Sequence, residues 1–291
     1  MATGECVFCG APVRSQGEHV LPRWLFPRWK GQGPFTVLVN GEPVAKRDGV
    51  TEREQLPRVM LPVCGSRDPM DCNGWLNSTF EAAGKPQVRS VLDDLRRIEG
   101  DAVAAFARWA VKTVLLYAHP LASNSEIGHL DVGRSVLRLP DPALPAMRRT
   151  GEFPEDLTLW MAVVDPAGPP GRLPAVDRGS LPRIVRPGEG GSDCSGATVG
   201  LSLPDGRTVV FQLLFHPLID VVNPFESSGW VTRLWPAPPA ALDIAAHPVL
   251  GSDGRRELTS WFYVGGVEIG VQQGERWPDG PTGRALRAMQ H

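Results

Sequence analysis

Apolar residues recur at helical spacing in the middle of the chain and predict a helix over residues 88–119. The spacing is clearest in EGDAVAAFARWAVKTVLLYA, where the positions that would share one apolar face are Ala102, Phe106, Trp109, Thr113 and Leu116. His119 and Pro120 follow and end the pattern. We expect this face to pack in a core. Arg108 and Lys112 lie one turn apart, and a solvated surface accounts for them as well as contact with phosphate.

The second half of the chain has short apolar runs between prolines and glycines, which is typical of strands joined by turns. Residues 157–165 predict one strand, and residues 197–215 predict a hairpin that turns at the Pro-Asp-Gly sequence 204–206. Residues 260–273 predict a further strand or pair of strands. The stretch 165–193 contains Pro-Pro and Gly-Gly pairs and is typical of a loop.

These elements predict an α+β fold in three consecutive parts. Residues 1–86 would form an N-terminal unit, 87–119 a helical connector and 120–291 a β-rich C-terminal domain. The chain has 291 residues, of which 42% are hydrophobic, so it can build one large domain or two ordinary ones. Within the first part, an Asn-Gly pair in residues 35–46 predicts an inserted hairpin.

Composition and charge narrow the class of protein. The net charge of −2 argues against a uniformly basic protein that coats nucleic acid, but it leaves room for a local basic patch. No apolar run reaches the roughly 18 residues typical of a transmembrane helix. The first residues, MATGECVFCG, lack the charged and apolar regions of a secretory signal. We therefore expect a cytoplasmic protein with no membrane partner, where clustered cysteines bind metal more often than they form disulfides.

The cysteines predict a structural zinc site. The five cysteines are Cys6, Cys9, Cys64, Cys72 and Cys194. CVFCG is a C-x2-C knuckle whose glycine supplies a positive φ. Because two thiolates do not complete a tetrahedral site, Cys64 and Cys72 would supply the other two ligands, in a C-x7-C spacing longer than the usual C-x2-C. Reduced, partly buried thiols are the alternative interpretation, and Cys194, in a Gly/Ser loop, is treated as a bystander.

The residues after Cys72 predict a short helix with a polar stripe. Asn73, Asn77 and Glu81 recur every four residues and would share one face, which makes Asn77 and Glu81 additional candidates for a site. Gly84 and Pro86 are expected to end this helix. Asparagine is a poor helix former, which suggests a role for its side chain. The alternative is that Asn73 only caps the helix.

The stretch GEHVLPRWL, residues 17–25, places Glu18 directly before His19. In a regular half-buried strand the two side chains would point to opposite faces and be unrelated. A metal ligand beside a general base instead requires a bend at this point, and Gly17 makes a bend feasible.

Taken in order, C-x2-C, Glu-His-x-x-Pro-x-Trp-Leu and Cys-Asn-x-Trp-x5-Glu resemble the HNH endonucleases of the ββα-metal superfamily. The resemblance covers residues 6–81 and is strongest to the zinc-bound subgroup with an EHxxPxWL first motif. It implies an N-terminal ββα-metal unit with zinc knuckles. It also implies His19 as the general base, and Glu18 and Asn73 as ligands of a catalytic Mg²⁺ or Mn²⁺.

The chain departs from the family pattern in the middle motif. The family asparagine that precedes the second cysteine pair is absent, and Arg58 and Val59 occupy that neighbourhood. Another polar group would then have to orient His19. Arg14, Arg23 and Arg58 are candidate contacts to phosphate, although solvent exposure accounts for each of them equally well.

The function expected from the resemblance is a metal-dependent endonuclease that hydrolyses DNA, with RNA as an open alternative substrate. The C-terminal region would choose the target, in restriction or anti-phage defence by analogy alone, and a homodimer would permit double-strand breaks. The competing hypothesis is a non-catalytic zinc module that binds DNA or protein. A hydrolase built on His216, His247, Asp220 and Cys194 is less well supported, because the chain has no nucleophile elbow, no H-E-x-x-H and no P-loop.

Overall fold

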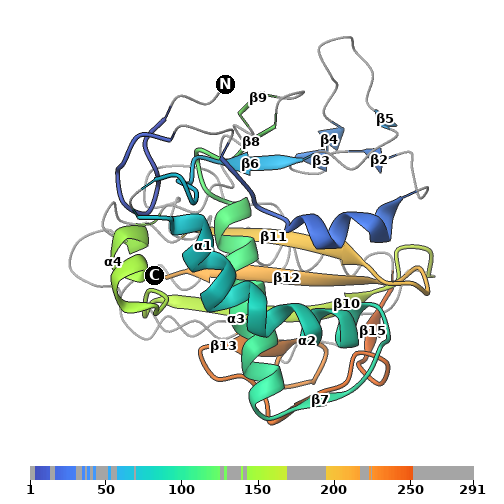
Figure 1. Ribbon diagram of the computed structural model, residues 1–291. Helices are drawn as coiled ribbons and strands as arrows, with labels where there is room; N and C mark the ends of the chain where they lie inside the picture. Colours follow the sequence, from blue (N-terminus) through green and yellow to red (C-terminus); the bar gives the residue numbers. More distant parts are fainter. Residues whose placement is uncertain are drawn as a thin grey trace, which may run out of the picture. The chain divides into compact units, whose positions relative to one another are not determined.

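The chain adopts a mixed helix and strand fold, α+β, with a β-rich region in its second half, as the sequence predicts (Figure 1). Among the described residues, no helix is both long enough and apolar enough to cross a membrane. The computed structural model describes residues 4–13, 17–30, 35–36, 38–39, 42–43, 52–53, 58–68, 70–124, 128–129, 139, 143–168, 195–216, 223 and 225–251.

The backbone forms two compact units, and each is built from two separate stretches of the chain. Unit 1 comprises Met1–Ala83 and Lys112–Pro154, and unit 2 comprises Gly84–Val111 and Glu155–His291. The boundary after Val111 falls inside a helix, so this helix supplies residues to both units. The three consecutive parts expected from the sequence stay a prediction.

Unit 1 contains a small antiparallel sheet with the strand order β1-β6-β8-β9. In its first pair, Glu18 lies opposite Leu61 and His19 opposite Met60. Strand β1 has only two residues, and the Val20 amide that follows it still donates to the Val59 carbonyl of β6 at 3.0 Å. The strands of this sheet are β1 (Glu18–His19), β6 (Val59–Leu61), β8 (Ser123–Asn124) and β9 (Gly128–His129).

Between β1 and β6 the chain forms a 3₁₀ helix and two small ladders, in which β2 pairs with β5 and β3 with β4. The pairing of β3 with β4 confirms a hairpin within residues 35–46, although its Asn-Gly turn lies outside the described residues. The bounds of these elements are η1 Arg23–Trp29, β2 Phe35–Thr36, β3 Leu38–Val39, β4 Glu42–Pro43 and β5 Glu52–Arg53.

One long helical segment follows the second cysteine pair (Figure 1). Its consecutive parts are α1 (Cys72–Leu76), the π-helical turn η2 (Asn77–Glu81) and α2 (Ala82–Leu92). The expected helix end at Gly84 and Pro86 is wrong, because α2 runs through both residues. Gly84 has a packing role instead: a Cβ there would lie 2.6 Å from the Cβ of Trp109, so only glycine allows this approach.

Helix α3 (Asp101–Tyr117) carries the predicted apolar face and ends where the pattern predicts. The helix predicted over 88–119 is nevertheless interrupted before α3, because Leu95 and Gly100 have φ angles of 51° and 54°. These positive angles are incompatible with a right-handed helix. Unit 1 also contains α4 (Ala143–Thr150), which the sequence analysis does not predict.

Unit 2 is built on a sheet with the order β11-β12-β10-β13, in which β15 pairs parallel to β10. All eight residues of β10 are buried, as in a strand covered on both faces. The strand and the hairpin predicted here are confirmed, and Gly206 in the turn has a φ of 88°. The strand bounds are β10 Leu157–Val164, β11 Ser195–Ser202, β12 Thr208–Phe215, β13 Thr232–Trp235 and β15 Val249–Leu250.

The part of α3 that belongs to unit 2 packs on this sheet, since the rings of Phe106 and Phe211 lie 6.0 Å apart. A separate ladder joins β7 (Ile98–Glu99) to β14 (Ala241–Leu242). The strand predicted over 260–273 and most of the loop predicted over 165–193 lie outside the described residues.

Candidate functional site

The four N-terminal cysteines, Cys6, Cys9, Cys64 and Cys72, converge on one point of unit 1. Their sulfur atoms all lie within 4.8 Å of one another, and the Sγ atoms of Cys9 and Cys64 are 3.6 Å apart. Tetrahedral zinc with bonds of about 2.3 Å separates its sulfur ligands by about 3.8 Å. The cluster therefore fits a zinc ion in both donor chemistry and spacing. Cys194 lies outside the described residues.

Each half of the cluster is shaped by its own turn. In the first, the Gly10 amide donates to the Cys6 carbonyl at 2.8 Å, and Gly10 has the expected positive φ of 72°. In the second, the Asp68 carboxylate accepts from the Gly65 amide at 3.0 Å. The Cys72 amide donates to the Cys64 sulfur at 3.4 Å. The residues between Cys64 and Cys72 thus form a compact loop, which explains how the long C-x7-C spacing still brings both thiols together.

Burial sets the protonation of the second cysteine pair. It raises the pKa of the Cys64 thiol to about 11 and also raises the pKa of Cys72. Both thiols are therefore protonated near neutral pH until a cation replaces their protons, which is the usual coupling between metal binding and proton release.

Beside this cluster, unit 1 has a cavity of about 500 Å³ that is open to solvent on one side. It brings together six of the predicted site residues, namely Glu18, His19, Arg23, Asn73, Asn77 and Glu81. Arg58 does not line the cavity; it is exposed, with its guanidinium 5.8 Å from the Phe26 ring centroid. Arg14 lies outside the described residues. Other lining residues, which sequence reasoning did not connect with the site, include Ser66, Asp71 and Lys112.

Glu18 and His19 both face this cavity although they are adjacent in β1. Gly17, directly before this pair, has a positive φ of 85°, which turns the chain where it enters β1. A Cβ at Gly17 would overlap the carbonyl oxygen of Leu61, so the position excludes every other residue type without a backbone shift. His19 is 8% exposed, and its ring packs edge-on against the Phe26 ring, with 5.5 Å between the ring centroids.

Burial acts in opposite directions on the pKa values of Glu18 and His19. Burial raises the pKa of Glu18, while Lys112, Arg23 and a hydrogen bond from the Asn73 side chain oppose the rise. Burial lowers the pKa of His19, and so does the positive charge of Arg23 and Arg58. The imidazole is therefore neutral at pH 7, the form that accepts a proton. Its Nδ1 atom has no hydrogen-bond partner among the described residues.

The polar stripe of the helical segment also faces the cavity. Asn73 does not cap the helix: Asp71, with a left-handed φ of 36°, is the N-cap, and its side chain accepts from the Gly74 amide at 2.9 Å. Asn73, Asn77 and Glu81 stay on one side because an α-helical turn is followed by a π-helical one. Four residues of an α-helix rotate the side chain by slightly more than one full turn about the axis, and four residues of the wider π-helix rotate it by slightly less than one turn. The two deviations cancel, so the three side chains stay on one face.

Glu81 is anchored on both carboxylate oxygens. The Lys112 ammonium donates to Oε1, and the indole Nε1 of Trp24 donates to Oε2 at 3.1 Å. Lys112 is 3% exposed, so the solvated-surface interpretation is wrong for this residue. The three side chains come from η1, η2 and α3, and together they fix one wall of the cavity.

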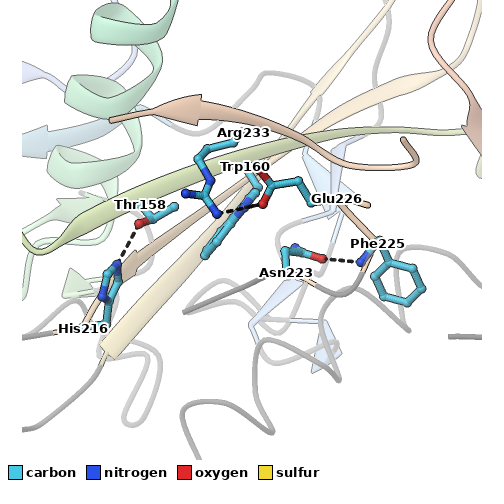
Figure 2. A network of polar contacts seen from close by, with 7 residues as sticks. All are labelled: Thr158, Trp160, His216, Asn223, Phe225, Glu226 and Arg233. Carbon is cyan, nitrogen blue, oxygen red and sulfur yellow. Dashed lines mark hydrogen bonds and ion pairs between the residues drawn. The ribbon is translucent and has the colours of Figure 1, made fainter. Parts of the chain in front are cut away.

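His216 and His247 of unit 2 make structural contacts. Figure 2 shows the His216 ring against Thr158, with 2.7 Å between Nε2 and Oγ1. His247 contacts the Thr232 hydroxyl at 3.1 Å and the Pro248 carbonyl at 2.9 Å. In the same figure Glu226 accepts from Trp160 and from Arg233. These pairs tie strands and turns together, and Asp220 lies outside the described residues.

The structure therefore contains two neighbouring features in unit 1, a four-thiol cluster and a cavity lined by several charged and polar side chains together with the buried His19. Comparison with protein-family models, with curated proteins and with solved structures finds no match to this chain.

Proposed function

We propose that the chain is a metal-dependent endonuclease of the HNH type that hydrolyses phosphodiester bonds in DNA. The observation that carries the proposal is the shared cavity of Glu18, His19 and Asn73 beside the four-thiol cluster. The order of β1, β6 and α1 supports a ββα-metal unit, with zinc bound by Cys6, Cys9, Cys64 and Cys72.

The chemistry of the cavity fits a hard divalent cation. The Glu18 carboxylate and the Asn73 amide oxygen are donors of the type that Mg²⁺ or Mn²⁺ prefers, with water filling the other positions. When bound, such an ion stabilises the charge that develops on the phosphate and on the leaving oxygen. A cation beside Glu18 also offsets the burial that raises the pKa of this carboxyl.

His19 would act as the general base. Its neutral ring removes a proton from a water molecule while the water oxygen forms a bond to phosphorus. The bond from phosphorus to the leaving oxygen then breaks, and that oxygen takes a proton from solvent. Arg23, exposed at the cavity rim, is placed to contact a neighbouring phosphate. Unit 2 would select the target; a role in restriction or anti-phage defence, and a homodimer that cuts both strands, rest on analogy alone.

The second candidate function is a non-catalytic zinc module that binds DNA or protein. The Nδ1 atom of His19, for which the described part of the chain offers no hydrogen-bond partner, favours this function, because a general base is normally held by a hydrogen bond at its other ring nitrogen. The family's middle asparagine, which would orient this ring, is absent from the sequence.

A nicking assay separates the two functions. Supercoiled plasmid is incubated with the protein and Mg²⁺ or Mn²⁺, with chelator as the blank, and a single-stranded RNA is run in parallel. We expect DNA nicking that His19→Ala abolishes and that the matched control His119→Gln, which lies in the turn after α3, leaves unchanged. Absence of cleavage of either nucleic acid would favour the binding module. Equal nicking by His19→Ala would exclude this histidine as the base.

A further inference from the structure

A zinc ion bound by four thiolates carries two net negative charges, which raises the question of what balances them. Cys6, Cys64 and Cys72 are buried at 3%, 0% and 0% exposure, so water screens the cluster poorly. Buried charge is costly unless it is paired or hydrogen-bonded.

Arg148 of α4 lies against the cluster. Its side chain lies beside the Cys72 thiol and opposes the burial that raises the pKa of that thiol, and its Nη2 donates to the Met70 carbonyl at 3.1 Å. Its guanidinium also lies over the Trp75 ring, 5.0 Å from the centroid. Trp75 in turn meets Phe8, inside the first cysteine knuckle, edge-on at 5.4 Å. The arginine is therefore held by the loop that precedes Cys72 and by the helix that follows it.

The donors of this guanidinium are not used up by these contacts. Its Nε is buried and has no hydrogen-bond partner among the described residues. An arginine is always charged, and this one has a buried N–H group that is available to a further acceptor. Such a side chain is better matched to an anionic neighbour, as a metal-bound thiolate cluster is, than to neutral thiols.

We infer that Arg148 is the counter-ion of the four-cysteine metal site and slows the release of its zinc. The inference rests on the zinc site of the proposed function and not on catalysis. Residues that hydrogen bond to metal ligands typically change metal affinity by about 10–100-fold when they are removed. Arg148 is thus a positioning residue: it acts on the metal through Cys72.

The test compares wild type with Arg148→Met, Arg148→Lys and the neighbouring control Arg149→Met, which removes an exposed charge from the same helix. Each full-length protein is purified with zinc, and the transfer of zinc to a chromogenic chelator is timed at neutral pH. We expect transfer about 10–100-fold faster from Arg148→Met, an intermediate rate from Arg148→Lys and no change from Arg149→Met.

The relative rates of zinc transfer decide whether Arg148 acts as the counter-ion. Equal rates for wild type and Arg148→Met overturn the inference, and so does a Lys variant as fast as the Met variant, because packing alone would then explain the loss. If Arg148→Met does not fold, Arg148→Lys carries the test, since it must still release zinc faster than wild type. Wild-type protein that holds no zinc overturns this inference together with the zinc site, whereas loss of nicking alone leaves the inference standing.

Discussion

Replacing Lys112 by methionine will leave the Glu81 carboxylate buried without its ammonium partner. The two side chains are 4% and 11% exposed, so little water is available to solvate the carboxylate that remains. Removing one member of a buried ion pair typically costs about 3–5 kcal/mol. The Trp24 indole still donates to Glu81 in the variant, which places the expected loss near the lower end, about 3 kcal/mol.

The double variant Glu81→Gln/Lys112→Met makes the reasoning specific. It removes both charges but keeps an acceptor for the Trp24 indole, so it should recover most of the lost stability. Thermal unfolding followed by circular dichroism measures the effect, and about 3 kcal/mol corresponds to a decrease in Tm of roughly 6–12 °C. Lys30→Met, which removes an exposed ammonium, is the control and should stay within about 1 °C of wild type. A double variant no more stable than Lys112→Met would refute the reasoning.

Three further predictions concern other parts of unit 1. Stripping the metal with a zinc chelator under reducing conditions should expose all four cluster thiols to iodoacetamide, seen by mass spectrometry as four added labels; unchanged labelling would contradict a metal at this position. Gly17→Ala should destabilise the protein by roughly 1–3 kcal/mol in urea unfolding, because its φ of 85° and the Leu61 carbonyl leave no room for a Cβ; an unchanged midpoint would show that the bend is not required. Burial lowers the pKa of His119 to about 4, so the folded protein binds fewer protons than the unfolded chain below about pH 6.5. Stability should therefore fall, by on the order of 2 kcal/mol, as the pH drops from about 6.5 to 4. His119→Gln should flatten this part of the Tm-against-pH curve. Identical curves for the variant and wild type would argue against a lowered pKa of His119.

The sequence predicted those elements that depend only on neighbouring residues in the chain. The hairpin of β11 and β12 follows from Pro204, Asp205 and Gly206, and the knuckle from two cysteines and Gly10. Gly84 was misinterpreted for a physical reason: a glycine that ends a helix and a glycine that admits a neighbouring Trp109 look the same in one sequence.

The candidate site was predictable only where its residues lie within the motif. Glu18, His19 and Asn73 are marked by their neighbours in sequence, and they share a cavity. Lys112 lies 31 positions from its partner Glu81, and a lysine on an amphipathic helix is usually solvated, so no sequence signal points to it. Arg148 was missed for the same reason, because α4 approaches the cysteine loop only in the folded chain.

The two ends of the segment between β1 and β6 lie close together in the folded chain. The Cys9 and Cys64 sulfurs are 3.6 Å apart, and Glu18 pairs with Leu61, so both ends of the intervening chain are fixed independently of what it contains. Doubling the length of such a loop costs only about 0.6 kcal/mol. Insertions and deletions between η1 and β6 are therefore nearly neutral for the cavity, because the part of the segment that lines the cavity wall, with Arg23 and Trp24, lies before that point.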